Sequence, residues 1–193
     1  MKRTGIFGGT FNPVHNGHLR LAGWIVDNGV FDEVWLTLSP ANPLKDDRPG
    51  ATDADRQRML VLACKDKKGL QPNFVEFDMP RPSYSISTLR KLAADYPERR
   101  FGLIIGSDNW QIFNRWRAHD EIIRDFGVTV YPRPGYEVGA QPLPDGVSYL
   151  ADAPVTDASS TDIRAALRSG DSTLLPPAVA DYITAHNLYE HAR

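Results

Sequence analysis

The segment from Gly8 to His18 holds the residues whose types and spacing are best suited to chemistry. It reads Gly-Gly-Thr-Phe-Asn-Pro-Val-His-Asn-Gly-His, after an apolar run at residues 4–7 and before a run with helical periodicity at residues 19–26. This pattern predicts a strand, a glycine-rich loop and a helix. Adjacent glycines let the backbone approach a ligand closely, and a helix start offers unpaired N–H groups to an anion. We therefore predict a phosphate site here.

Two histidines end this segment. His15 and His18 are three residues apart, so both imidazole rings can reach one oxyanion and donate a hydrogen bond to it. Metal binding by the pair is the alternative, but no Cys, Asp or Glu close by completes a ligand set with the usual spacing. We therefore predict phosphate or nucleotide binding and no metal site made by the protein.

The composition fits a single globular domain spanning residues 1–193. Hydrophobic residues make up 41% of the chain and charged residues 24%, which are ordinary values for such a domain. A formal net charge of −2, without a segment rich in Lys and Arg, argues against a general nucleic-acid or membrane-surface binder. The one cysteine, Cys64, is expected to be a buried thiol. The apolar run near the N-terminus breaks at Gly8, so we expect no signal peptide and a cytoplasmic protein.

The elements that must position the motif alternate along the chain. Strands are expected at residues 4–7, 33–38, 73–77, 101–105, 128–131 and 148–150. Helices are expected from residue 19, from Thr52 or Asp53, and at residues 87–92, 109–116 and 119–126. A helix at residues 161–169 is expected to start at Ser159 or Ser160, and a last helix at Pro176-Pro177. This alternation predicts an α/β fold, a Rossmann-like doubly wound parallel sheet of five to six strands with helices on both faces and a C-terminal helical segment.

The predicted strand order places a second glycine-bearing loop next to the first. Right-handed crossovers usually put the first strand of such a sheet beside the fourth, at the point where the order reverses. The fourth predicted strand ends in Gly106-Ser107-Asp108, and the first ends in Gly8-Gly9. We therefore expect the ligand to lie between these two loops.

Taken together, the motifs resemble the nucleotidylyltransferase superfamily marked by a His-x-Gly-His signature, and within it the bacterial nicotinate mononucleotide adenylyltransferases. The resemblance extends over almost the whole chain. It is carried by residues 8–13 with 15–18, 42–45, 82–85 with Thr88-Leu89, 105–108, Trp116, 133–135, 159–164, and Tyr182-Ile183 before Leu188-Tyr189. The His-x-Gly-His signature names only the superfamily, whereas the Ser-Tyr-Ser segment, Trp116 and the Ser-Ser-Thr-x-x-Arg helix start point to this member.

The resemblance implies the joining of nicotinate mononucleotide to the AMP part of ATP, with release of pyrophosphate. Such a reaction needs no serine, cysteine or general base, because the nucleophile is a phosphate that is already an anion. Magnesium is expected to arrive with the ATP phosphates. The alternatives are a pantetheine-phosphate adenylyltransferase of the same superfamily and a nucleotide-binding regulator without catalysis. The sequence leaves the oligomeric state open, and a homo-oligomer is compatible with it.

The resemblance also assigns roles to individual residues. His15 and His18 are the catalytic candidates, with His18 the better one for the transition state. The expected ATP-binding residues are Gly8, Gly9, Thr10, Phe11, His15, His18, Gly106, Asp108, Ser160, Thr161 and Arg164. The expected mononucleotide-binding residues are Lys45, Tyr84, Ser85 and Trp116. Trp116 would stack on the pyridine ring, and backbone N–H groups near Tyr84 and Ser85 would bind the nicotinate carboxylate.

Several of these residues also have plainer interpretations. Asp108 fits a turn after a strand, the residues near Ser160 fit a capped helix, Trp116 fits a core position, and Lys45 fits a solvated loop. Two positions depart from the commonest pattern of the family. Asn12 stands where many members have aspartate, and the segment before Lys45 lacks a histidine often found there. The contacts of the Lys45 loop therefore stay open.

Overall fold

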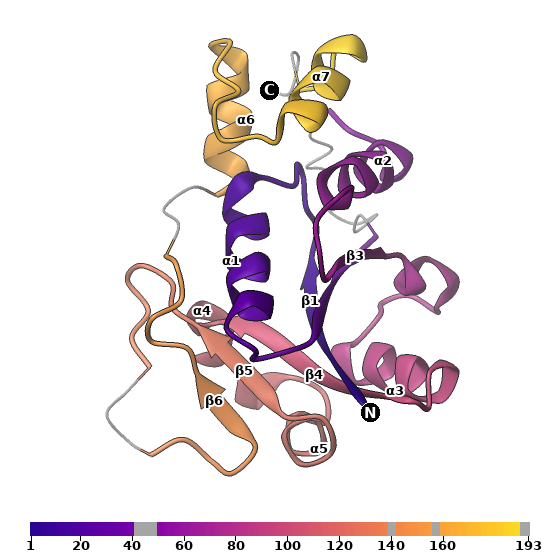
Figure 1. Ribbon diagram of the computed structural model, residues 1–193, viewed down its shortest axis with the longest axis vertical. Coiled ribbons are helices and arrows are strands. Elements are labelled where there is room, and N and C mark those ends of the chain that lie inside the picture. The colour runs from indigo at the N-terminus through magenta and orange to yellow at the C-terminus, as the bar shows by residue number, and fades with distance from the viewer. Residues whose placement is uncertain (41–49, 139–141, 156–158, 190–193) are drawn as a thin grey trace.

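The computed structural model describes residues 1–40, 50–138, 142–155 and 159–189. Six parallel strands form one sheet in the order β3-β2-β1-β4-β5-β6. The strands are β1 Lys2–Gly9, β2 Glu33–Leu38, β3 Leu70–Asn73, β4 Arg99–Gly106, β5 Val128–Tyr131 and β6 Val147–Tyr149. The doubly wound parallel sheet and the pairing of β1 with β4 are therefore confirmed (Figure 1).

Helices follow the strands along the described part of the chain. The α-helices are α1 Asn16–Asp27, α2 Asp53–Cys64, α3 Ser85–Asp95, α4 Ser107–Trp110, α5 His119–Asp125, α6 Ser160–Arg168 and α7 Pro177–Ala185. Two short 3₁₀ helices, η1 Val75–Asp78 and η2 Phe113–Arg115, lie between them. Figure 1 shows α6 and α7 together at one end of the molecule. No helix in the described ranges is long and apolar enough to cross a membrane.

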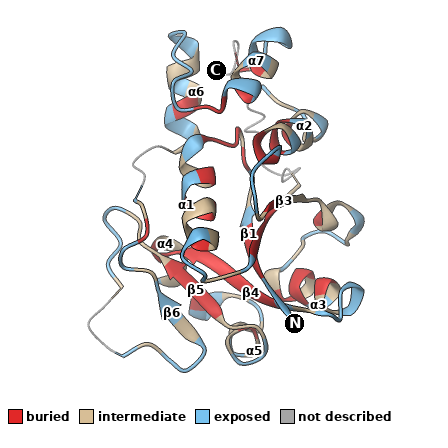
Figure 2. Ribbon diagram, viewed as in Figure 1, coloured by how far each residue is buried: buried red, intermediate tan, exposed pale blue. Residues whose placement is uncertain are grey.

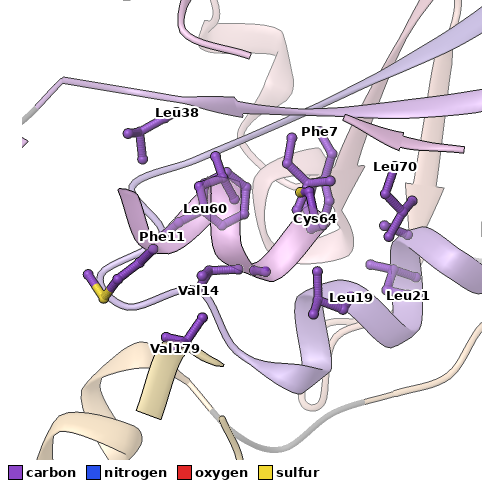
Figure 3. Packing of buried hydrophobic residues seen from close by; sticks show 14 of the residues in the cluster. Phe7, Phe11, Val14, Leu19, Leu21, Leu38, Leu60, Cys64, Leu70 and Val179 are labelled. Carbon is purple, nitrogen blue, oxygen red and sulfur yellow. The ribbon is translucent and has the colours of Figure 1, made fainter. Parts of the chain in front are cut away.

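The two faces of the sheet have separate apolar cores. One core joins β1 and β2 to α1, α2, α6 and α7, with Phe7, Leu36, Leu60 and Val179 among its buried members. Figure 3 shows Phe11 and Val14 of the glycine-rich loop packed in this core near Val179. The other core joins the opposite face to α3, η2 and α5. The central strands are accordingly buried on both faces, as Figure 2 shows, which explains their nearly continuous apolar sequences.

Two predicted helix starts are confirmed by their capping bonds. The Thr52 hydroxyl accepts a hydrogen bond from the Asp55 N–H, and the Ser159 hydroxyl accepts one from the Asp162 N–H. In both helices the carboxylate at the third position accepts in return from the backbone N–H of the cap residue. These reciprocal pairs satisfy N–H groups that a helix start leaves unpaired.

Two predicted elements are wrong. The third strand was expected at residues 73–77 but spans Leu70–Asn73, and η1 follows it. The Asn73 side chain accepts from the Val75 N–H at 3.1 Å, and this local turn ends the strand. Pro72 is accommodated because β3 is an edge strand.

The helix expected at residues 109–116 is instead split into α4 and η2. Its aromatic residues recur every third position, and the ring centroids of Trp110 and Phe113 are 5.4 Å apart, with Trp116 a further 5.3 Å from Phe113. Side chains three residues apart lie above one another in a 3₁₀ turn, so the aromatic packing favours the tighter helix.

Candidate active site

The two glycine-bearing loops meet at the carboxyl edge of the sheet. Phe7 of β1 is in register with Ile104 of β4, so the ends of both strands lie side by side. A Cβ at Gly8 would meet no atom within 4 Å, which leaves the backbone open to an approaching group. This is the reversal point of the strand order, because β1 has β2 on one side and β4 on the other.

The conformation of the first loop is fixed by Arg56, a buried side chain of α2. One guanidinium nitrogen donates to the Thr10 carbonyl at 2.7 Å and to the Ser39 carbonyl at 2.9 Å, and another donates to Asp53 at 2.6 Å. Arg56 is 2% exposed. Burying a guanidinium is costly unless hydrogen bonds satisfy its donors. The loop after β1, the end of β2 and the start of α2, which supply these bonds, therefore constrain one another.

His15 and His18 form the centre of the site. His15 is the residue just before α1, His18 lies in the first turn, and their ring centroids are 3.6 Å apart. The backbone N–H of His15 donates to Nδ1 of His18 at 3.2 Å. Neutral His18 therefore carries its proton on Nε2, which has no hydrogen-bond partner within the described ranges and could donate to an anion. The two rings lie close together, and their binding of one oxyanion stays a prediction.

Both histidines are held neutral by their surroundings. Burial, with a smaller contribution from the charge of Arg133, lowers the pKa of His15 to about 4. Burial also lowers the pKa of His18 well below its usual range, and the charges of His15 and Arg133 act in the same direction. The rings thus present N–H donors near neutral pH, and Arg133 supplies a fixed positive charge near them.

The ring of Phe11 packs against His18 inside the core. Its ring is 2% exposed and packs edge-to-face against the rings of His18, with centroids 4.9 Å apart, and of Phe7, with centroids 5.8 Å apart. Its backbone φ is +40°, in the left-handed region that costs a non-glycine residue free energy. The ring belongs to the core, so contact between Phe11 and ATP, which remains a prediction, is left to its backbone.

The second loop brings Gly106, Asp108 and Arg133 together. A Cβ at Gly106 would clash with Asp108 Oδ1 and lie 2.9 Å from the Arg133 side chain, so the close approach requires glycine. The Arg133 Nε lies 3.6 Å from Asp108 Oδ1, which is buried and has no hydrogen-bond partner within the described ranges. The backbone N–H of Arg133 donates to the Ser107 hydroxyl at 2.9 Å. This loop therefore presents a carboxylate and a guanidinium beside the histidine pair.

The start of α6 lies against the first loop. The Ser160 hydroxyl donates to the Pro13 carbonyl at 3.1 Å. Arg164 donates to the Asn12 carbonyl at 2.8 Å and to the Thr161 hydroxyl at 3.1 Å. The predicted phosphate-binding residues of α6 are thus brought to the site, where their side chains hold the loop backbone.

Three of the predicted mononucleotide-binding residues, Tyr84, Ser85 and Trp116, belong to segments that pack on the other face of the sheet. Ser85 begins α3 and Tyr84 precedes it, at the carboxyl edge because α3 leads into β4. The Arg117 guanidinium lies 5.0 Å from the centre of the Tyr84 ring, which joins this helix start to the segment containing half-buried Trp116. Lys45 lies outside the described residues.

Two residues of the site were missed from the sequence. Arg133 was noted only as part of a motif, and Arg56 was not singled out. Arg56 occupies the same helical face as Met59, Leu60 and Ala63, all of which are buried. A charged residue in phase with an apolar face is a signal that could have identified it, because such a residue must find partners inside the protein.

Comparison with known proteins now places the chain in a family. The model of the family described as cytidylyltransferase-like matches residues 6–166. This range includes both glycine-bearing loops, both histidines and most of α6. The chain therefore belongs to the cytidylyltransferase-like family.

Individual relatives carry a more particular name. A protein of Bacteroides fragilis named a probable nicotinate-nucleotide adenylyltransferase is 44% identical over 179 residues, covering 92% of this chain and 89% of that protein. A protein of the same name from Flavobacterium johnsoniae is 36% identical over 191 residues, covering 97% and 99%. The chain thus aligns with these relatives over nearly their whole length.

Solved structures agree with this placement. A protein of Vibrio parahaemolyticus also carries the name nicotinate-nucleotide adenylyltransferase with a qualifier, as the two relatives above do. Its structure superposes with a TM-score of 0.70 at 26% identity, over 99% of this chain and 97% of its own. The nicotinic acid mononucleotide adenylyltransferase of Plasmodium falciparum complexed with NaAD superposes with a TM-score of 0.74 over 98% of each chain. At 16% identity the second likeness concerns the fold alone.

Replacing Arg56 with methionine should destabilise the protein by about 3 kcal/mol or more, because two carbonyls and a carboxylate lose a buried donor. Arg58→Met is the matched control, since Arg58 is an exposed residue of the same helix and should change stability by no more than about 0.5 kcal/mol. Urea unfolding of both variants measures the difference. Equal effects would show that the Arg56 bonds do not hold the loop.

Stability should fall as the pH is lowered from about 6.5 towards 4. In this window the unfolded chain protonates His15 while the folded protein keeps it neutral, so protons favour unfolding. The contribution is fully present above pH 6.5, and its loss reaches at most about 1.4 kcal/mol per pH unit for each histidine shifted in this way. Urea unfolding at pH 7, 6 and 5 should give a shallower pH dependence for His15→Asn than for the wild type. The same slope in both would contradict the neutral state of folded His15.

Proposed function

We propose that this chain is a nicotinate-nucleotide adenylyltransferase, which transfers AMP from ATP to nicotinate mononucleotide and releases pyrophosphate in NAD biosynthesis. The observation that carries this proposal is the pair of neutral histidine rings, His15 and His18, beside the open backbone of Gly8 at the β1–β4 edge. The names of the relatives over nearly the whole chain support the choice of substrate. In this proposal the chain acts as one domain in the cytoplasm.

The chemistry requires alignment and charge neutralisation rather than a nucleophilic side chain. The phosphate of the mononucleotide attacks the α-phosphorus of ATP, and the bond to the bridging oxygen of the pyrophosphate breaks. His18 Nε2–H donates to the phosphate oxygens as negative charge builds on the leaving group, and His15 acts beside it. Because each neutral ring keeps one N–H, both rings can donate without first taking up a proton.

The ATP site is assigned to the two loops and the start of α6. Gly8, Gly9 and the Thr10 and Phe11 backbones would face the phosphates, while Gly106 and Asp108 would hold the ribose. Asp108 Oδ1 supports this, because it has no hydrogen-bond partner among the described residues, with Arg133 Nε 3.6 Å away, and a ribose hydroxyl would supply a donor. Ser160, Thr161 and Arg164 would meet the outer phosphates.

Magnesium fits this proposal as an ion carried by the triphosphate. No group of three His, Cys, Asp or Glu side chains is placed to hold a metal in the part of the chain that the structure describes. The ion supplies neutralisation of the phosphate charge when it is bound. The side chains assigned to the phosphates are histidine, hydroxyl and guanidinium groups, which pair with phosphate oxygens directly.

The mononucleotide is assigned to the start of α3 and the Trp116 segment. Trp116 would stack on the pyridine ring, and the backbone N–H groups near Tyr84 and Ser85 would donate to its carboxylate. Lys45 would contact a phosphate from the loop outside the described residues. An uncapped helix start supports this assignment, since no side chain caps α3 at Tyr84.

The activity is tested by incubating the protein with ATP, magnesium and one acceptor at a time, and measuring pyrophosphate. The acceptors are nicotinate mononucleotide, nicotinamide mononucleotide and phosphopantetheine. We expect turnover with nicotinate mononucleotide and a specificity constant on the order of 10² to 10⁴ lower with nicotinamide mononucleotide. An amide places an NH₂ against donors that a carboxylate would satisfy, and a buried unpaired donor costs about 1–3 kcal/mol. Turnover only with phosphopantetheine would refute the proposal in favour of the related adenylyltransferase.

His18→Ala should lower kcat about 10²- to 10³-fold while changing the KM for ATP much less, because the His18 bond strengthens as charge develops. Steady-state kinetics at saturating nicotinate mononucleotide measure both constants. His186→Ala is the control, since His186 is an exposed residue at the end of α7 that stacks on Tyr182 and is given no role at the site. Near-normal turnover of the His18 variant would remove it from the catalytic group.

A further inference from the structure

Glu76 is a buried carboxylate to which the proposed reaction gives no role. It lies in η1 and is 8% exposed. The Ser83 hydroxyl donates to its Oε2 at 2.9 Å, and the Thr88 hydroxyl donates to its Oε1 at 3.0 Å. A buried carboxylate is tolerated when its oxygens are paired, so the three side chains fix one another.

The two hydroxyl groups lie on either side of the start of α3. Ser83 precedes the helix and Thr88 belongs to its first turn, while Tyr84 is the residue just before Ser85, the first helical residue. The Tyr84 carbonyl accepts from the N–H groups of Ser87 and Thr88 at 2.8 and 3.1 Å. The earlier N–H groups of the turn point out of the helix end, where a ligand would meet them. Glu76 therefore holds this helix end at two points.

Glu76 binds the hydroxyl groups on either side of this helix end. The Ser83 hydroxyl donates to Glu76, and the Thr88 hydroxyl lies 3.0 Å from Glu76 Oε1 and 3.4 Å from the Tyr84 carbonyl. Among these groups, the backbone N–H groups at the start of α3 remain to donate to a ligand. The Arg117 guanidinium, 5.0 Å from the Tyr84 ring, adds a positive charge at the same place. Such a surface favours a ligand group that only accepts hydrogen bonds.

We propose that Glu76 is a positioning residue that makes the start of α3 selective for a carboxylate over a carboxamide on the pyridine ring. This proposal rests on the proposed function, because that function brings the pyridine ring to α3. Glu76 acts through Ser83 and Thr88 and does not touch the substrate. Its two bonds keep the backbone donors at the start of α3 aligned, and aligned donors bind a carboxylate more strongly than a carboxamide.

Glu76→Gln tests this with little change in shape. A glutamine offers one oxygen acceptor in place of two, so one hydroxyl loses its acceptor and the helix end loses one of its two attachments. We expect kcat/KM for nicotinate mononucleotide to fall at least about tenfold, mainly through KM, and the preference over nicotinamide mononucleotide to narrow by a similar factor. The KM for ATP should stay within about twofold, because the hydrogen bonds of Glu76 among the described residues go to Ser83 and Thr88 and not to the loops assigned to ATP.

Asp78→Asn is the matched control, since it removes an exposed carboxylate from the same 3₁₀ helix. Asp78→Asn should leave the preference for nicotinate mononucleotide over nicotinamide mononucleotide unchanged. Thr88→Val, which removes one hydroxyl and keeps the side-chain shape, should narrow the preference as Glu76→Gln does. An equal loss of kcat/KM with both mononucleotides in the Glu76 variant would show that Glu76 has only a structural role and would overturn the proposal. An unchanged preference would overturn it as well.

Amide hydrogen exchange separates this proposal from the proposed function. Exchange in the peptide covering residues 83–88 should be faster in Glu76→Gln than in the wild type and in Asp78→Asn, because the helix end loses one of its two attachments. Equal exchange in all three proteins would overturn the positioning role, whatever the activity. A wild type that is inactive with nicotinate mononucleotide would refute the proposed function, and with it the selectivity assigned to this helix end, even where exchange is faster.

Discussion

The buried guanidinium of Arg56 is the constraint on which the arrangement of the site depends. It joins the backbone of the loop after β1, the end of β2 and the first turn of α2. Burying this charge is costly, so it is stable only while all three partners stay in place. The loop that carries Thr10 and Phe11 is therefore fixed before any ligand binds, and the strained backbone of Phe11 is retained because its neighbours leave no alternative.

The histidine pair supplies directed N–H donors and Arg133 supplies positive charge, whereas a single cationic histidine would have to supply both. Burial keeps His15 and His18 neutral, so they contribute directed N–H donors, while Arg133 contributes charge. A phosphate bound against both rings would favour their protonated forms and raise their pKa values. In the proposed function, anion binding would therefore be coupled to proton uptake at the pH values where the histidines of the free protein are still neutral.

The sequence predicted the sheet well because periodicity and strand order depend on local patterns and general handedness. The strand β2, the strand β5 and the caps at Thr52 and Ser159 agree with expectation. The prediction of a strand at residues 73–77 was wrong because the hydrogen bond from the Val75 N–H to the Asn73 side chain competes with strand pairing. The partners of Arg56 and Glu76 were out of reach, because they lie up to 46 residues away in the sequence and only the fold brings them together.

Asn12 shows how a departure from the family pattern fits the rest of the structure. Its side-chain oxygen accepts from the hydroxyl of Tyr189 at 2.6 Å, and its carbonyl accepts from Arg164. Burial raises the pKa of Tyr189, so this hydroxyl stays protonated and donates. An aspartate at this position would accept the same bond but would place a negative charge in the loop that the proposed function assigns to the phosphates. The neutral amide keeps the attachment between the C-terminal segment and the loop, and leaves the positive potential of Arg133 and Arg164 undiminished.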